Sequence, residues 1–255
     1  MNNTVFRYAA GWLIGVVCLF CVQGALADVA EGGQKVAQKL QKLRPGMQIS
    51  DISATPIPGI YALEIDGSTV YYGTEDGRYL FAGDLYELRD TELVNLAEAG
   101  RTVKRQALMA EVAVEDMLVF AAQGETRAVI SVFTDVDCGF CQKLHLEVPT
   151  LNTMGIEVRY LAFPRAGIGS RSYDRIVSAW CADDPNRAIT RLKAGESIPA
   201  ATCENPVTAQ FDLARRIGVT GTPSIVLEDG RLLAGYLPAD QLAKTVGFGD
   251  GAASD

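Results

Sequence analysis

Two cysteines separated by two residues are the clearest candidates for chemistry in this sequence. Cys138 and Cys141 lie in the stretch VISVFTDVDCGFCQKLH, residues 129–145. The pattern predicts an apolar strand, a short acidic turn and the start of a helix. Free N–H groups and the dipole at a helix N-terminus stabilise a thiolate, so the pKa of Cys138 is expected at roughly 3.5–7.5, against about 8.5 for a free thiol.

This placement predicts thiol–disulfide exchange. We interpret Cys138 as an exposed nucleophile and Cys141, one helical turn deeper, as the cysteine that attacks a mixed disulfide and releases the partner. The negative charges of Asp135 and Asp137 would oppose the thiolate. One alternative is a zinc site, but a zinc ribbon needs a second close cysteine pair or nearby histidines, and His145 is the only histidine. The other alternative is an inert disulfide between the two cysteines.

The beginning of the chain predicts export. Arg7 precedes an apolar run at 9–22, and Ala25-Leu26-Ala27 follows as a small-x-small cleavage site. Residues 1–27 are therefore predicted to be a signal peptide, with an uncleaved anchor as the alternative. The apolar run is short for a membrane span, which needs roughly 20 residues.

The predicted mature chain is acidic and carries an even number of cysteines. The net charge is −8 for the whole sequence, and the loss of Arg7 makes it more negative, which argues against nucleic acid as a partner. Four cysteines remain after cleavage, and an exported protein with an even count is expected to form disulfides. Cys181 and Cys203 are interpreted as a structural disulfide, worth roughly 3.4 kcal/mol in the chain-entropy model. Two free buried thiols are the alternative.

Residues 28–90 are predicted to form a small α+β domain. A helix is expected in EGGQKVAQKLQKL, and short alternating runs with Asp-Gly turns at 66–67 and 76–77 predict hairpins. A unit of this size is marginal alone, so we expect it to self-associate through a strand edge. Residues 91–114 are rich in helix-forming residues and predict a helical linker, although they could simply open the next domain.

The remainder predicts an α/β domain over 115–249, followed by a disordered tail at 250–255. A helical VEDMLVF, two buried strands in AVISVF and GIEVRYLAF, three helices, a hairpin and a last helix are expected. Pro223 in GVTGTPSIVL should begin a strand, because proline lacks the N–H of a central strand position. From the sequence alone, a trans Thr222-Pro223 bond is favoured.

Several motifs in the same order resemble the thioredoxin-like superfamily and, more closely, the DsbC/DsbG family of periplasmic protein-disulfide isomerases. They are VFTDVDCGFCQKLH, GIEVRYLAFPRAG, AWCADDPNRA and IGVTGTP. The resemblance implies a thioredoxin-like catalytic domain with a helical insert, preceded by a dimerisation domain at 28–90 and a helical linker. It implies that Cys138 is the nucleophile, Cys141 the resolving cysteine, and Cys181–Cys203 a structural disulfide.

The resemblance also implies that Thr222-Pro223 is a cis bond facing the cysteine pair, where it binds the substrate backbone. The expected function is isomerisation of wrong disulfides in exported proteins by a periplasmic homodimer. A membrane thiol reductase of the DsbD type would keep the pair reduced, and no metal or cofactor is needed. The alternatives are a dedicated thiol oxidase or reductase on the same scaffold, and a holdase-type chaperone.

Overall fold

The computed structural model describes residues 21–67 and 69–248, which form two compact units divided between Gly83 and Asp84. Most of the predicted signal peptide (1–27) and all of the predicted disordered tail (250–255) lie outside the described residues, so both stay predictions. Within the described ranges, no helix combines the length and apolarity needed to cross a membrane.

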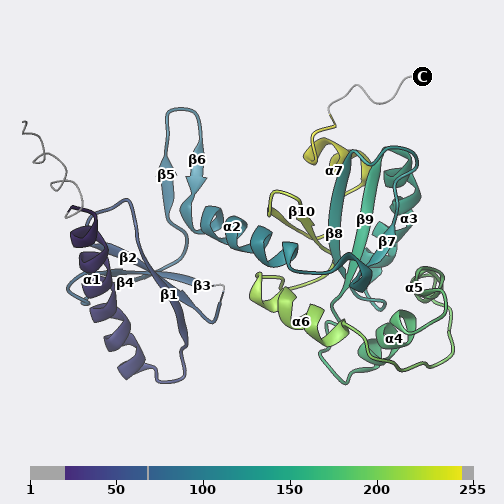
Figure 1. Cartoon of the computed structure of the whole chain (residues 1–255), viewed down its shortest axis with the longest axis horizontal. Coiled ribbons are helices and arrows are strands. Elements are labelled where there is room, and N and C mark those ends of the chain that lie inside the picture. Colours follow the sequence, from purple (N-terminus) through teal and green to yellow (C-terminus); the bar gives the residue numbers. More distant parts are fainter. Residues whose placement is uncertain (1–20, 68, 249–255) are drawn as a thin grey trace, which may run out of the picture. The chain divides into compact units, whose positions relative to one another are not determined.

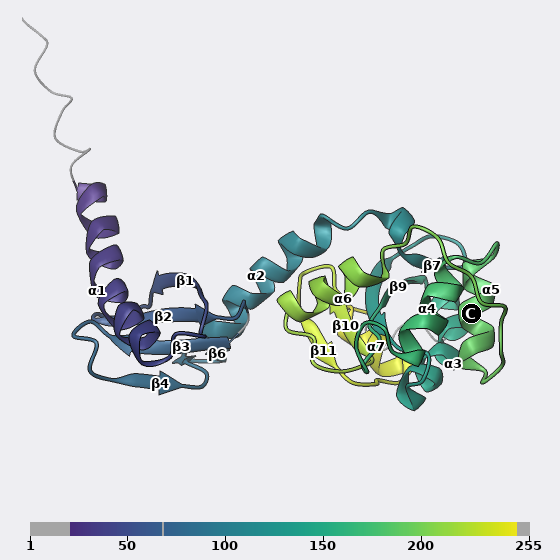
Figure 2. The ribbon, with the colours of Figure 1, turned by 90° about the horizontal axis from the view of Figure 1, so that it is seen from below.

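The first unit is a helix packed on an antiparallel sheet. The sheet has the order β1-β2-β3-β4, and the helix α1 contacts its first three strands, as both ribbon views show (Figures 1 and 2). The elements are α1 (Cys21–Leu43), β1 (Ile49–Ala54), β2 (Ile60–Ile65), β3 (Thr69–Thr74) and β4 (Leu80–Ala82).

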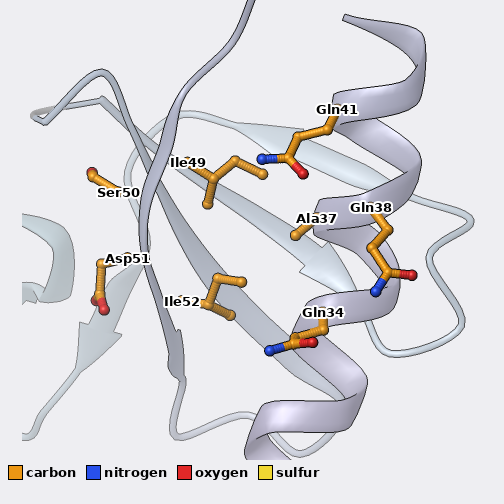
Figure 3. A pocket seen from close by; sticks show the side chains of 8 residues that line it. All are labelled: Gln34, Ala37, Gln38, Gln41, Ile49, Ser50, Asp51 and Ile52. Atoms are coloured by element: carbon orange, nitrogen blue, oxygen red, sulfur yellow. The ribbon is translucent and has the colours of Figure 1, made fainter. Parts of the chain in front are cut away.

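The core of this unit is small and depends on glycine. Val36 and Ala37 of α1 pack on Leu63, which alternates with half-buried neighbours along β2. A Cβ atom on Gly73 would lie 2.5 Å from Val36 Cγ2, closer than van der Waals contact allows. Gly73 therefore lets the helix approach the sheet closely. A polar groove of about 480 Å³ lies between α1 and β1 (Figure 3). Its lining side chains come from both elements and are Gln34, Ala37, Gln38, Gln41, Ile49, Ser50, Asp51 and Ile52.

Two expectations for the first half of the chain were incomplete. β1 was not predicted, because its exposed Ser and Asp positions leave only an irregular apolar pattern. The run DLYEL was expected to join the small sheet; instead β5 (Tyr86–Leu88) pairs with β6 (Leu93–Asn95) as a separate hairpin.

The helical stretch begins later than Thr91. α2 (Leu96–Ala110) starts after Asn95, whose side chain accepts a hydrogen bond from Glu98 N at 3.0 Å. This Asn-x-x-Glu spacing is a helix N-terminal signal. The buried Arg105 then donates from Nε to Ile217 O at 3.0 Å and from Nη1 to Gly230 O at 2.7 Å. These bonds attach α2 to the rest of the second unit.

The second unit has a five-stranded sheet in the order β11-β10-β8-β9-β7. β8 and β9 are parallel, and the other pairs are antiparallel. The strands are β7 (Leu118–Phe120), β8 (Ala128–Thr134), β9 (Ile156–Ala162), β10 (Ser224–Leu227) and β11 (Leu232–Ala234). The helices are α3 (Gly139–Thr153), α4 (Arg171–Trp180), α5 (Pro185–Lys193), α6 (Val207–Arg216) and α7 (Ala239–Thr245).

Both faces of this sheet are buried, which explains the continuous apolar strands. Ile130 and Tyr160 point into a core shared with α3, α4, α5 and α7. Phe133 and Leu161 point to the opposite core, which includes side chains of α6 and α2. The cysteine-bearing helix α3 is thus fixed between the sheet and its neighbours (Figure 1).

The prediction of a helix at VEDMLVF was wrong. Val114–Asp116 form a single 3-10 turn, and Leu118–Phe120 form β7, paired with the outer edge of β9. A short apolar run is compatible with either a helix or a strand. Here the edge of β9 offers backbone hydrogen-bonding partners, so the segment forms a strand.

Candidate functional site

The cysteine pair lies where β8 turns into α3. Cys138 is the N-cap residue of α3, and its Sγ accepts a hydrogen bond from Cys141 N at 3.3 Å. Both cysteines are free thiols. The helix therefore presents its free N–H groups to the Cys138 sulfur, as the sequence predicted.

The surroundings separate the two thiols by their acidity. The Cys141 thiol, the Thr222 hydroxyl, Cys141 N and the charge of Arg165 together lower the pKa of Cys138 from 9.0 to about 5, against the opposing effect of burial. The pKa of Cys141 is raised by the Cys138 sulfur and then by burial. The two coupled thiols thus carry a single negative charge, and that charge resides on Cys138.

The prediction that Cys138 is exposed was wrong. Cys138 is 2% exposed and Cys141 1%. The Cys138 Sγ lies 3.2 Å from the carbonyl oxygen of Thr222, so the loop before β10 covers it. The Cys138 thiol is thus acidic but covered. A partner must displace the loop before β10, or align with it, to reach the sulfur.

Thr222 and Pro223 face the pair from the loop before β10. The Thr222-Pro223 bond is cis, not trans as the sequence alone favoured. The loop is held by a bond from Ser224 Oγ to Gly221 O at 2.8 Å and by a bond from Gly235 N to Pro223 O at 2.9 Å. The buried Thr222 hydroxyl has no hydrogen-bond partner among the described residues, and its position favours the thiolate forms of both cysteines.

Asp135 is a structural anchor of the site rather than a free charge beside the thiolate. Its carboxylate accepts hydrogen bonds from Asp137 N at 2.8 Å, Arg165 N at 2.8 Å and Ser172 Oγ at 3.1 Å. Arg165 also pairs with it at 3.4 Å. Arg165 thus compensates the negative charge of Asp135, and its positive charge is one of the causes that lower the pKa of Cys138.

The sequence analysis assigned no role to Arg165, although its position just after a buried strand could have indicated one. Arg165 follows β9, and β8 and β9 are parallel, with Thr134 opposite Ala162. The carboxyl ends of adjacent parallel strands meet at one edge of a sheet, so a residue just after β9 belongs beside one just after β8.

Lys193 and His145 line a pocket together with Gly139 and Gln142, which are neighbours of the two cysteines in the chain, and neither was predicted there. Lys193, at the end of α5, is 5% exposed and donates from Nζ to Thr134 Oγ1 at 2.7 Å. His145 contacts Tyr160 Oη through Nδ1 and Thr190 Oγ1 through Nε2, both at 3.0 Å. Burial, and secondly the charge of Lys193, lower the pKa of His145 to about 4, so its ring is neutral at ordinary pH.

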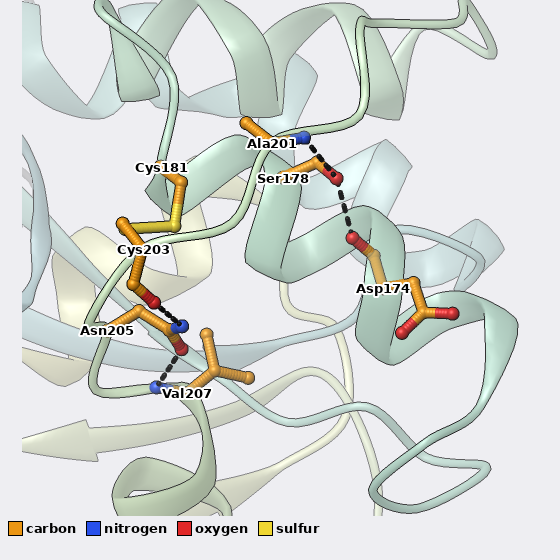
Figure 4. The surroundings of a disulfide bond; sticks show 7 residues. All are labelled: Asp174, Ser178, Cys181, Ala201, Cys203, Asn205 and Val207. Carbon is orange, nitrogen blue, oxygen red and sulfur yellow. Dashed lines mark hydrogen bonds between the residues drawn. A yellow bond between two sulfur atoms is a disulfide. The ribbon is translucent and has the colours of Figure 1, made fainter.

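The second cysteine pair forms a disulfide, and neither of its cysteines is the N-cap residue of a helix. Cys181 is the C-cap of α4, and its Sγ is bonded to that of Cys203 with a Cα–Cα distance of 5.6 Å. Asn205 donates to Cys203 O at 2.8 Å, and Ala201 N donates to Ser178 Oγ at 3.3 Å (Figure 4). The disulfide ties α4 to the segment that leads into α6.

The structure gives no support for zinc. In the part of the chain that is described, no group of three or more His, Cys, Asp or Glu side chains is arranged to hold a metal ion.

Comparisons with known proteins agree with this geometry. Residues 114–249 match a thioredoxin-like domain family, and residues 23–98 match the N-terminal domain family of disulfide bond isomerase proteins. The chain is 36% identical over 225 residues to the thiol:disulfide interchange protein DsbC of Escherichia coli, covering 88% of this chain and 92% of that protein. This chain belongs to the DsbC family.

A second DsbC protein and one solved structure are also similar to this chain, the solved structure over a smaller part of it. The DsbC of Haemophilus influenzae is 36% identical, with 88% of this chain and 93% of that protein covered. A crystal structure of a disulfide interchange protein from Neisseria gonorrhoeae is 26% identical and has a TM-score of 0.48, covering 53% of this chain and 96% of that one. Membership of the DsbC family confirms the predicted thioredoxin-like fold and the predicted thiol:disulfide interchange activity.

Proposed function

We propose that this chain isomerises wrong disulfides in exported proteins, with Cys138 as the nucleophile and Cys141 as the resolving cysteine. One observation carries the assignment of roles: the sulfur with the lowered pKa is the one at the N-cap of α3, whereas the pKa of its neighbour is raised. At neutral pH only Cys138 is a thiolate, and the thiolate is the attacking species.

The proposed reaction consists of successive thiol–disulfide exchanges. The Cys138 thiolate attacks one sulfur of a substrate disulfide, a Cys138–substrate disulfide forms, and the other substrate sulfur leaves as a thiolate. That thiolate can then attack a different substrate disulfide, and Cys138 is finally released as a thiolate with no net oxidation. If this fails, Cys141 attacks Cys138 Sγ, which leaves the protein pair oxidised and the substrate reduced.

The stabilised Cys138 thiolate also supports an isomerase. A low thiol pKa favours the reduced pair over its disulfide, and isomerisation requires reduced Cys138. A reductant must return the oxidised pair to this state, and we assign that role to a membrane thiol reductase of the DsbD type.

Thr222 and Pro223 are proposed to hold the substrate backbone. The Thr222 carbonyl oxygen is 3.2 Å from Cys138 Sγ. A peptide joined to this sulfur must therefore lie against the Thr222 main chain, whose polar groups can pair with it.

The proposed setting is a periplasmic homodimer formed through residues 28–90. A leader with an Ala-x-Ala site and an even cysteine count support export. The small core of the first unit supports association. Sedimentation at micromolar concentration is expected to show a dimer, and a monomer would contradict this part of the proposal.

The function is tested with a scrambled multi-disulfide protein. A catalytic amount of the reduced chain should restore activity to that protein, and Cys138→Ser should not. Net oxidation or net reduction alone would identify an oxidase or a reductase instead. Full recovery with Cys138→Ser would point to a holdase chaperone.

A further inference from the structure

Phe140 is an exposed aromatic residue between the two cysteines of the site. It lies in the first turn of α3, and it is 64% exposed. Every other aromatic side chain between residues 114 and 248, a range that the structure describes throughout, is buried or half-buried. A single apolar residue on a surface is common, but this one follows the reactive Cys138 by two positions and contributes nothing to either core.

Tyr236 supports the ring of Phe140. The two ring centres are 6.4 Å apart and the ring planes make an angle of 22°, which is a stacked arrangement. The Tyr236 hydroxyl donates to Glu147 Oε1 at 2.6 Å, and Lys143 Nζ lies 4.4 Å from the centre of the Tyr236 ring. Glu147 is fixed in turn, because its Oε2 accepts from Ala239 N at 3.3 Å. The rings of Phe140 and Tyr236, named here the aromatic platform, are therefore held in place by the fold.

The aromatic platform adjoins the loop that covers Cys138. Gly235 N donates to Pro223 O at 2.9 Å, so the segment that carries Tyr236 is bonded to the loop before β10. In the same loop, Thr222 O lies 3.2 Å from Cys138 Sγ. One ring is thus connected to the site through the first turn of α3, and the other ring through the loop that a substrate must displace or follow.

The exposed surface of the platform is apolar and rigid, which decides the chemistry of its partner. The ring of Phe140 carries no hydrogen-bond donor or acceptor, and the hydroxyl of Tyr236 is already bonded to Glu147. Such a surface favours an aliphatic or aromatic side chain, because contact removes apolar area from water on both sides. A surface that is rigid before binding also loses little conformational entropy when the complex forms.

We propose that the aromatic platform selects substrates by the residue next to their reacting cysteine and favours a leucine or an aromatic side chain there. Phe140 contacts that side chain, and Tyr236 is a positioning residue for Phe140. The Cys138 thiolate attacks the substrate sulfur, a Cys138–substrate disulfide forms, and the other sulfur of the substrate disulfide leaves as a thiolate. The neighbouring side chain lies on the platform while this bond forms. This inference rests on the proposed role of Cys138.

Such a preference distinguishes wrong disulfides from native ones. Cysteine is among the residue types that are most often fully buried in a native fold. The apolar residues around a native disulfide are packed in the core and cannot reach a second protein, whereas a misfolded chain exposes them. A surface that needs a free apolar side chain beside the sulfur therefore recognises misfolded chains and discriminates against native disulfides.

The test measures how fast the reduced chain attacks short peptides that differ in one residue. Each peptide carries one cysteine bonded to thionitrobenzoate, and attack by Cys138 on the peptide sulfur releases the yellow thionitrobenzoate thiolate. The residue before or after the cysteine is leucine, phenylalanine, serine or glutamate, and the remaining residues are alanine. Each second-order rate constant is divided by that of glutathione with the same peptide, which removes differences in the intrinsic reactivity of the peptides.

In the wild type, the leucine and phenylalanine peptides should react about 3- to 10-fold faster than the serine peptide in at least one of the two placements, the range expected for one aromatic contact. Phe140→Ser should bring this ratio close to one, and Tyr236→Ala should lower it. Tyr236→Phe should keep most of the ratio, because the supporting ring remains. All peptides meet the same thiolate, so a change in the acidity of Cys138 cancels in the ratio.

The matched control is Leu146→Ser. It removes another exposed apolar side chain of α3, outside the platform, and should leave the ratio unchanged. A variant that is only partly folded lowers the rates of all peptides by the same factor, so a folding defect does not alter the ratio either.

Three results would overturn the inference. They are equal wild-type rates for the leucine and serine peptides in both placements, a wild-type ratio retained in Phe140→Ser, and a faster reaction of the glutamate peptide than of the leucine peptide. The last result would assign the selection to the charge of Lys143 rather than to the rings. Absence of thionitrobenzoate release by the wild type with every peptide would instead count against the proposed function.

Discussion

The two cysteine pairs of the second unit use the same residue type for opposite purposes. Cys138 occupies the N-cap of α3, where the helix stabilises a negative sulfur. Cys181 occupies the C-cap of α4, where the carbonyl end of a helix disfavours one. A thiolate is therefore available for exchange in the first pair. In the second pair, the helix end at Cys181 would not stabilise the thiolate that leaves when the disulfide is attacked.

The comparison shows that position on a helix, rather than the presence of cysteine, decides reactivity. The spacing matters as well: Cys138 and Cys141 are one helical turn apart, whereas Cys181 and Cys203 are 22 positions apart and close a long loop. Closing a long loop restricts the unfolded chain, so the second pair contributes to stability. Four changes test this division of roles, in order of decreasing effect.

Removing the reactive sulfur should have the largest effect. Cys138→Ser is expected to lower the rate of disulfide interchange by on the order of 10³ or more, because in the described part of the chain Cys138 is the free thiol that caps a helix N-terminus. The measurement is turnover on a scrambled disulfide protein. A matched Cys203→Ser, Cys181→Ser double variant at low temperature should keep the activity; equal loss in both would erase the distinction between the pairs.

Removing the structural disulfide should chiefly affect stability. The Cys181→Ala, Cys203→Ala double variant is expected to lose roughly 3.4 kcal/mol of unfolding free energy, the loop-closure entropy of the segment between them. Denaturant unfolding with the cysteine pair at 138 and 141 held reduced measures this. An unchanged midpoint would show that the pair does not stabilise the fold.

The acidity of Cys138 gives a specific pH dependence. Its pKa of about 5 lies below the ordinary 9.0, so its contribution to the stability of the reduced form is complete above the ordinary value and is lost as the pH falls through about 5. The ultraviolet absorbance of the thiolate should titrate with a midpoint near pH 5, and Cys141→Ala should raise that midpoint because it removes the main stabilising hydrogen bond. A midpoint near 9 in the wild type would contradict the assignment.

The smallest effect is expected from the positive charge beside the site. Arg165→Met should raise the midpoint of the Cys138 titration by less than Cys141→Ala does, because the charge of Arg165 lowers the pKa of Cys138 less than the Cys141 thiol does and its side chain is 46% exposed. Arg187→Met, on the exposed side of α5, is the control and should leave the midpoint where it is. A larger shift from Arg165 than from Cys141 would reverse the ranking of causes.

Much of the second unit was predictable because its strands have a strong local signal. The strands at 128–134 and 156–162 are continuous apolar runs, as expected of strands buried on both faces. The segment at 114–120 was assigned wrongly, because its conformation is decided by the free edge of β9 rather than by its own pattern. The strand at 49–54 was missed because exposed polar residues interrupt its apolar positions.

The sequence predicted the two reactive sulfur atoms of the site but not the residues that surround them. A Cys-x-x-Cys after a buried strand predicts a helix N-terminus from sequence alone. The burial of Cys138 under the Thr222 loop was not predictable, because 84 positions separate the residues in contact. Lys193 carries no local signal at all: it ends an ordinary amphipathic helix, and only the packing of α5 brings its amine to the end of β8.

The sequence by itself determined which atoms can exchange disulfides and which of the two cysteines at the motif lies at the helix N-terminus, because capping and spacing are local properties. The tertiary structure alone decided how reactive those atoms are. The lowered pKa of Cys138, its cover by Thr222, the neutralisation of Asp135 by Arg165 and the placement of Lys193 all arise from contacts between segments far apart in the chain, and electrostatic effects depend on distance in space.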